Sequence, residues 1–223
     1  MFMRKMIVLA FILSCGAPAA LAQSHNIEIT PFGGGKFGGK IAVNSGTVDN
    51  LLIKSSVDYG VTFDYGFWDT FQAEFTWERQ PTALSAHDVS TQPPTVTRLS
   101  NINLDTYQFG ILYDFRDTEA KVRPFFGAGV GFTHFGQATT TNSSGQTQSI
   151  LPFGNKLAYN VGGGVKYYFS RYVGLRFDAR WLRTRTTPGQ GQICDQFTGQ
   201  CFTVATTNHA NQFPINLGLI FRF

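Results

Sequence analysis

The sequence predicts an all-β fold, a closed antiparallel up-and-down transmembrane barrel of eight strands with short periplasmic turns and long extracellular loops. Three observations lead to this prediction. The chain opens with a secretory signal, eight later segments alternate apolar and polar residues, and no stretch after residue 22 is long enough for a spanning helix. Because lipid offers no partner to backbone amides, strands that span a membrane must close into a barrel.

Composition agrees with a sheet and narrows the classes of function. The 223 residues include 24 Gly and 22 Phe, which disfavour long helices and disorder respectively. The formal charge of +4 falls to +2 when Arg4 and Lys5 leave with the signal, because 16 basic residues then face 14 acidic ones. The basic residues are scattered along strand-like segments, so we expect no nucleic-acid partner.

The N-terminal residues 1–22 predict a cleaved signal peptide, which leaves the barrel domain at 23–223. Arg4 and Lys5 precede an apolar run over 6–13, and Ala20-Leu21-Ala22 supplies the small residues of a cleavage site. The run is too short for a transmembrane anchor. The alternative is lipoprotein processing at Cys15, although Leu13 is a poor fit for the small residue that such a site prefers.

Removal of the signal leaves two cysteines, Cys194 and Cys201, in a compartment that oxidises thiols. We expect a disulfide between them, which would close a short surface loop and stabilise the fold by roughly 2.5 kcal/mol less any strain. Metal binding is the alternative, but two cysteines without a nearby histidine pair do not complete a site.

The first four predicted strands occupy residues 26–39, 55–66, 70–79 and 101–116. The first is the least regular, because Pro31 and the glycines at 33–35 predict a bend or bulge. The other three show clear period-two alternation. Their apolar faces hold Val57, Tyr59, Val61, Phe63, Tyr65, Phe71, Ala73, Phe75, Trp77, Tyr107, Phe109, Ile111, Tyr113 and Phe115.

The last four predicted strands occupy residues 123–136, 155–170, 172–185 and 209–223. Each again presents one apolar face, rich in aromatic residues, and one face of polar residues and glycine. The apolar faces hold Phe126, Ala128, Val130, Phe132, Leu157, Tyr159, Val161, Val165, Tyr167, Phe169, Val173, Leu175, Phe177, Ala179, Trp181, Phe213, Ile215, Leu217, Leu219, Phe221 and Phe223.

Connection lengths distinguish a membrane barrel from a soluble sandwich, which also alternates apolar and polar residues. Short turns are expected near 67–70, 117–122 and 170–172. Long polar connections are expected near 40–54, 80–100, 137–154 and 186–208. Short and long connections alternate, as they must when one rim faces the periplasm and the other faces the outside.

The polar faces predict a lumen filled by side chains, since eight strands leave no room for a broad aqueous pore. Both charge signs occur there, which predicts a network of buried ion pairs that plugs the lumen. The predicted members are Asp58, Asp64, Glu74, Glu78, Asp114, Arg116, Arg123, Lys166, Arg176, Asp178 and Arg180. Inward glycines at 127, 129, 131, 162 and 164 would leave space for the long charged side chains.

Three sequence runs carry a family resemblance: Ile29-Thr30-Pro31-Phe32-Gly33-Gly34, the run 124–131, and the C-terminal segment 213–223. Together they resemble the OmpA/OmpW-like family of eight-stranded barrels. The resemblance implies a Gram-negative outer membrane, contact with lipid and lipopolysaccharide, and insertion by the barrel-assembly machinery. It implies an assembly signal formed by Phe213, Ile215, Leu217, Leu219, Phe221 and Phe223.

The function expected from the sequence is structural or surface-directed, with long loops such as 137–149 meeting lipopolysaccharide, host or phage molecules. The resemblance implies an alternative, a narrow conduit for small hydrophobic molecules. A lipid-modifying enzyme is the least favoured, since only His134 of the four histidines lies at a strand end near hydroxyl-rich sequence. We therefore expect no enzyme activity, no cofactor and no metal.

Overall fold

The fold is that of a computed structural model, which describes residues 26–45, 48–88, 95–117, 119–136, 138–141, 147–151, 154–185, 190–194, 201–205 and 209–223. These residues form strands, turns and bends, and no helix among them has the length and apolar character needed to cross a membrane. The predicted signal peptide, its cleavage site and Cys15 lie outside the described residues.

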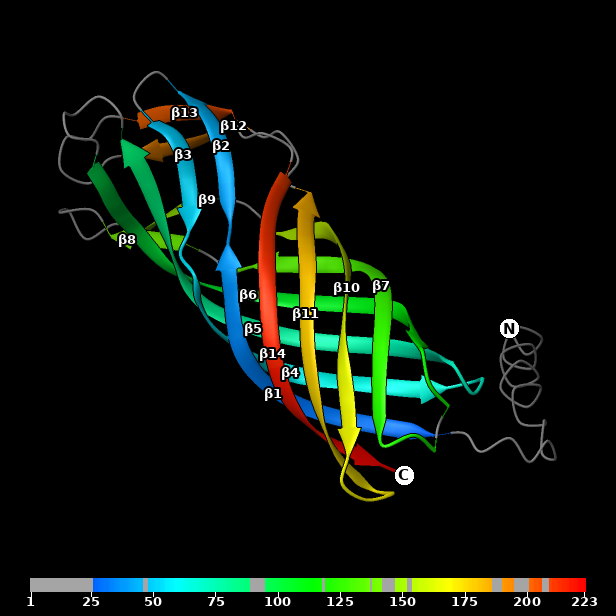
Figure 1. The fold of residues 1–223 in the computed structure, drawn as a ribbon. Coiled ribbons are helices and arrows are strands. Elements are labelled where there is room, and N and C mark those ends of the chain that lie inside the picture. Colours follow the sequence, from blue (N-terminus) through cyan, green and yellow to red (C-terminus); the bar gives the residue numbers. More distant parts are fainter. Residues whose placement is uncertain are drawn as a thin grey trace, which may run out of the picture.

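Eight strands form the barrel wall, and each pairs antiparallel with its two neighbours. In order around the wall they are β1 (Ile27–Gly38), β4 (Ser56–Gly66), β5 (Phe71–Asp88), β6 (Thr95–Asp114), β7 (Val122–Phe135), β10 (Asn155–Tyr168), β11 (Val173–Arg185) and β14 (His209–Arg222). Pairing of β1 with β14 closes the sheet, as Figure 1 shows by the contact of the blue and red strands. The predicted closed barrel is therefore confirmed.

The two ends of the barrel differ in the length of their connections. At one end lie the start of β1, the C-terminal Phe223 and the short turns that follow β4, β6 and β10. There the Phe223 amide donates to the Ile27 carbonyl oxygen at 2.9 Å. At the other end the connections contain further hairpins (Figure 1), formed by β2 (Lys40–Ser45), β3 (Val48–Ile53), β8 (Ala138–Thr141), β9 (Thr147–Leu151), β12 (Gln190–Cys194) and β13 (Cys201–Ala205).

The length predicted for two strands is wrong. Most of the stretch 80–100, expected as a polar connection, is strand, because β5 and β6 remain paired as far as Asp88 and Thr95. Strand residues outside the lipid need no apolar face. The polar composition of this stretch therefore predicted a connection instead of a strand. In β1 the glycines and Pro31 cause no bulge, since the strand keeps one register against β4 from Ile27 to Lys36, and the strand curves along the barrel wall instead (Figure 1).

The two faces of the barrel wall have opposite chemistry. Large apolar side chains on the outer face are open to the surroundings, for example Phe109 at 59% and Leu217 at 57% exposure. The inner face buries Asp64, Lys166 and Arg123 almost completely. A soluble sandwich would place these residues the other way round, whereas lipid around an apolar exterior accounts for the pattern.

Candidate functional site: the charged lumen

The part of the lumen near the termini is centred on Lys166 of β10. Its ammonium group donates hydrogen bonds to Glu28 at 2.7 Å, to Asp64 at 3.1 Å and to the side-chain oxygen of Gln72 at 2.6 Å. Both carboxylates and the lysine are fully shielded from solvent. All three protons of the ammonium group are used, so this cation tethers β1, β4 and β5 to β10 across the barrel.

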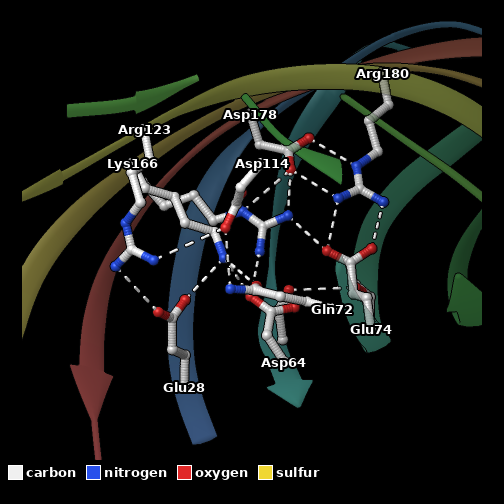
Figure 2. Close-up of polar contacts among 12 residues, drawn as sticks. Glu28, Asp64, Gln72, Glu74, Asp114, Arg123, Lys166, Asp178 and Arg180 are labelled. Carbon is white, nitrogen blue, oxygen red and sulfur yellow. Dashed lines mark hydrogen bonds and ion pairs between the residues drawn. The ribbon is translucent and has the colours of Figure 1, made fainter. Parts of the chain in front are cut away.

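Two arginines of β11 extend this network toward the middle of the barrel (Figure 2). Arg176 contacts Asp64 at 2.9 Å, Glu74 at 2.6 Å and Asp178 at 2.7 Å. Arg180 lies against both oxygens of Glu74, at 2.5 and 2.8 Å, and also contacts Asp178 at 2.8 Å. Glu74 and Asp178 therefore hold two guanidinium groups side by side, and their negative charge offsets the repulsion between them.

Arg123 of β7 is held in a different way. Its guanidinium lies 3.5 Å from Glu28 and 3.8 Å from Asp114, and its carbon lies 3.8 Å from the centre of the Tyr168 ring. The Tyr168 hydroxyl in turn donates to Glu28 at 2.5 Å. Charge attraction and cation–π stacking thus position Arg123 without close hydrogen bonds from its guanidinium.

Above the charged network, toward the end with the hairpins, the lumen becomes neutral and then apolar. Lys36 pairs with Glu78, and beyond them Gln212 donates to Gln80 at 2.9 Å. Hydroxyl contacts of 3.3 Å link Thr133 of β7 to Thr106 on the neighbouring strand β6 and to Thr184 on β11. The buried apolar side chains of this half are Leu84, Ile102, Leu104, Phe135, Ala158, Leu182 and Ala210.

Little empty space remains at mid-lumen. A cavity of about 30 Å³ lies between Thr30 and Phe32 on one side and Gln108 and Arg180 on the other. That volume admits only about two water molecules. The charged network therefore fills the barrel cross-section on the side of the termini.

Ten of the eleven residues predicted for the lumen network face the interior. Arg116 is the correction, because β6 ends at Asp114 and Arg116 is exposed in the bend that follows. The alternation of side chains stops where the strand stops.

Sequence reasoning missed Glu28, Lys36, Gln72 and Tyr168. Glu28 and Lys36 belong to the first strand. Its glycines interrupt the apolar alternation, so the sequence did not show which of its residues face inward. The period of two still holds there, since both residues have the same parity as Thr30, which is also buried. The two-residue alternation alone could have identified all four residues. Gln72 lies two residues from Glu74, Tyr168 lies two residues from Lys166, and Glu28 and Lys36 lie an even number of residues from Thr30.

The inward glycines have a broader role than the one predicted. A Cβ at Gly162 would overlap the Ala179 carbonyl oxygen of the neighbouring strand and would also lie 2.8 Å from Cγ of Arg180, and only the second contact matches the prediction that these glycines leave space for long side chains. At Gly164, however, the Cβ would lie 2.8 Å from the Phe125 ring and would overlap the Phe177 carbonyl oxygen. These positions therefore allow close approach of a neighbouring strand as well as of charged side chains.

The remaining candidate residues lie apart from the lumen network. His134 is exposed and contacts the Asn155 side-chain oxygen at 2.8 Å. No group of metal-binding side chains occurs within the described ranges. Cys194 and Cys201 are direct backbone partners in the β12–β13 hairpin, a placement that permits the disulfide expected from the sequence. The assembly-signal residues Phe213, Ile215, Leu217, Leu219, Phe221 and Phe223 are all exposed on the outer face or at its end.

A closed eight-stranded sheet, apolar outside and charged inside, with short and long connections at opposite ends, defines an integral outer-membrane β-barrel protein. Within that class the chain belongs to the OmpW family, which it matches over residues 35–189. The matched segment runs from the first strand to just past β11, and it includes the lumen network except for Glu28.

Solved structures of outer-membrane proteins have a similar fold. Outer membrane protein OprG from Pseudomonas aeruginosa is 15% identical, with 88% of this chain and 95% of that chain covered and a TM-score of 0.54. AlkL, solved in lipid bilayers, is 17% identical, with 93% and 95% covered and a TM-score of 0.52. The outer membrane protease OmpT from Escherichia coli is 8% identical, with 92% and 99% covered and a TM-score of 0.50. Identities this low show the fold alone, and comparison with curated protein sequences gives no match.

Proposed function

We propose that this protein is a non-enzymatic outer-membrane barrel whose lumen is closed to solutes and whose function lies at the cell surface. The observation that carries the proposal is the buried network around Lys166, Arg176 and Glu74, which crosses the lumen from wall to wall. Export through the secretory pathway and insertion by the barrel-assembly machinery belong to the same proposal.

The network is costly to open, which supports a permanent plug. Removal of one partner from a buried ion pair typically costs about 3 to 5 kcal/mol, because the other charge stays behind without compensation. Here each cation contacts two or more carboxylates, so a solute would have to separate several pairs together. Thermal fluctuation of a single side chain would not clear a path.

The surface role is supported by the length of β5 and β6. They contain 18 and 20 residues, whereas a transmembrane strand needs about 9 to 11. The surplus forms a ribbon on the side away from the chain termini, where β3 pairs with it. This ribbon and its neighbouring hairpins are the part of the molecule that we propose meets lipopolysaccharide or extracellular ligands.

Solute flux through reconstituted liposomes tests the closed lumen. We expect vesicles that contain the folded protein to release small ions and sugars no faster than protein-free vesicles. A variant with Lys166, Arg176 and Arg180 all replaced by Ala serves as the matched positive control, since it removes most of the plug. Selective passage through the unmodified barrel would contradict the proposal.

A second candidate function, a conduit for small hydrophobic molecules, has one specific observation in its favour. The lumen near the hairpins contains buried apolar side chains, and the strand pairing of the wall beside it is interrupted over residues 80–82, where β5 passes from pairing with β4 at Arg79 to pairing with β3 at Leu84. A recess of about 620 Å³ lies there, lined by Lys54, Ser56 and Pro81 among others. An apolar molecule would then leave sideways into the bilayer, above the plug.

The two candidates differ in what an apolar probe should do. A fluorescent alkane analogue added outside would enter barrel-containing vesicles faster than empty ones only if the conduit operates. Leu104→Arg would block the outer half of the lumen, while Val130→Ala on the outer face would leave it open and provides the control. Equal uptake by all vesicles would eliminate the conduit.

A further inference from the structure

A group of cations lies on the outer face of the barrel, just beyond its aromatic residues. Arg183 and Arg185 of β11 lie on the same outward face of the strand as Trp181. His209 of β14 is the direct cross-strand partner of Arg185. Cross-strand partners have Cβ atoms about 5 Å apart, so the three side chains form one patch. We call Arg183 and Arg185 the rim cations.

The rim cations lie at a height where lipid headgroups begin. Trp181 packs edge-on against Tyr159 with ring centres 6.3 Å apart, and such aromatic pairs mark the membrane interface. Arg183 and Arg185 follow Trp181 by two and four residues toward the end with the hairpins. A strand rises about 3.3 Å per residue, so the two arginines lie roughly 7 and 13 Å farther along the tilted strand.

The patch lacks a negative partner within the described residues. Neither β10 nor β14, the strands on either side of β11, contains any Asp or Glu. The Arg183 Nε is buried without a hydrogen-bond acceptor, and its guanidinium carbon lies 5.8 Å from the Trp181 ring centre.

Arg79, on the same face of β5, provides the contrast. It forms a two-pronged pair with Asp105 at 2.7 and 3.0 Å, and is thereby neutralised within the protein. Arg183 and Arg185 have no such carboxylate among the described residues, although they lie on the same outer face of the barrel. An external anion at this height would supply the missing acceptor.

We propose that the rim cations bind a phosphate group of an outer-leaflet glycolipid, the phosphorylated lipid A part of lipopolysaccharide. Guanidinium groups match phosphate in shape and can bind it through two parallel hydrogen bonds. The apolar surface below, with Trp181, Tyr159 and Phe213, would contact the acyl chains of the same molecule. This site does not depend on whether the lumen conducts.

Binding of lipid A to the full barrel in detergent micelles, measured by native mass spectrometry, tests the proposal. The probes are bisphosphorylated lipid A and the same lipid after enzymatic removal of both phosphates. We expect the phosphorylated lipid to bind preferentially, and Arg183→Gln/Arg185→Gln to weaken its binding about tenfold. Arg171→Gln, an exposed arginine in the turn at the opposite end, is the matched control and should bind like the unmodified protein.

Three results would overturn the site: equal binding of both lipids, unchanged binding by the double glutamine variant, or full displacement of the lipid by millimolar inorganic phosphate. The last result would indicate a site for free phosphate instead. If the glutamine variant fails to fold, Arg183→Lys/Arg185→Lys keeps the charge but loses the planar donor pair. It should show an intermediate affinity, and an affinity equal to that of the unmodified protein would also contradict the proposal.

Discussion

Glu74 is the residue on which two buried arginines depend. It contacts Arg176 at 2.6 Å and Arg180 at 2.5 Å, and it is 4% exposed. Asp178 contacts the same two arginines and also uses both of its oxygens, but it lies beside them on β11, whereas Glu74 reaches them from β5. The charge of Glu74, more than its volume, therefore determines whether this part of the lumen is stable.

Replacement of Glu74 by Gln should destabilise the barrel by about 3 to 5 kcal/mol, because it leaves two buried cations undercompensated. Urea unfolding in lipid vesicles, followed by tryptophan fluorescence, measures this loss. Glu119→Gln in an exposed turn is the matched control and should change the free energy of unfolding by less than about 0.5 kcal/mol. Equal stability of the two variants would show that the network contributes nothing.

Gly131 shows how closely two strands approach each other. A Cβ at this position would overlap the Tyr107 carbonyl oxygen and lie 2.7 Å from Cα of Gln108, both on β6. We therefore expect Gly131→Ala to cost about 1 to 3 kcal/mol in the same unfolding assay. Gly33→Ala is the control, since its Cβ would meet nothing closer than 3.8 Å. A loss shared by both variants would point to chain entropy instead of a clash.

At the scale of elements, β14 combines closure with an exposed apolar stripe. It pairs with β1 and β11, and its outward residues from Phe213 to Phe223 are each 38% exposed or more. Such a stripe can be recognised before the barrel closes and still face lipid afterwards. The exposure of Phe223 is therefore compatible with the assembly signal expected from the sequence.

Phe223→Ala should reduce the amount of folded protein in the outer membrane several-fold in cells, while refolding into detergent micelles should be unaffected. The reason is that Phe223 is 73% exposed and stabilises little in the finished fold. Tyr172→Ala is the control, because this aromatic residue is similarly exposed at the same end but lies outside the C-terminal segment 213–223. Cell fractionation measures the outcome, and equal yields of both variants would contradict a targeting role.

The disulfide predicted from the sequence would lie in the β12–β13 hairpin. Cys194 and Cys201 are opposite one another in its register. We expect unfolded protein from the cell envelope to react with maleimide at these positions only after reduction. Labelling without reductant would show that the thiols are free.

Element boundaries reveal what the sequence could predict and what it could not. Lipid imposes alternation on every spanning strand, so all eight wall strands were recognisable, along with ten of the eleven predicted lumen charges. Outside the lipid this constraint disappears, and the sequence of the paired ends of β5 and β6 therefore predicts a polar connection. Partner choice within the lumen was also beyond reach, because Lys166 and Glu28 lie 138 residues apart in sequence.

At the scale of the whole molecule, a continuous ring of backbone hydrogen bonds explains an expected resistance to detergent. Unheated samples in sodium dodecyl sulfate should migrate as a compact form and shift to the position of the unfolded chain only after boiling. A gel of outer-membrane fractions measures this change. A heat-independent position, or recovery of the protein from the soluble periplasm, would contradict the membrane assignment.

Pairing of β1 with β14 also determines when folding of the barrel can be completed. Glu28 of β1 is opposite Arg222 of β14, so the strand that leaves the export pore first must wait for the one that leaves last. Until then the nascent chain has an unsatisfied edge and a row of exposed Phe and Leu side chains, a combination prone to aggregation. We therefore expect the protein to depend on periplasmic holding chaperones, because its seam joins the first and the last strand of the barrel.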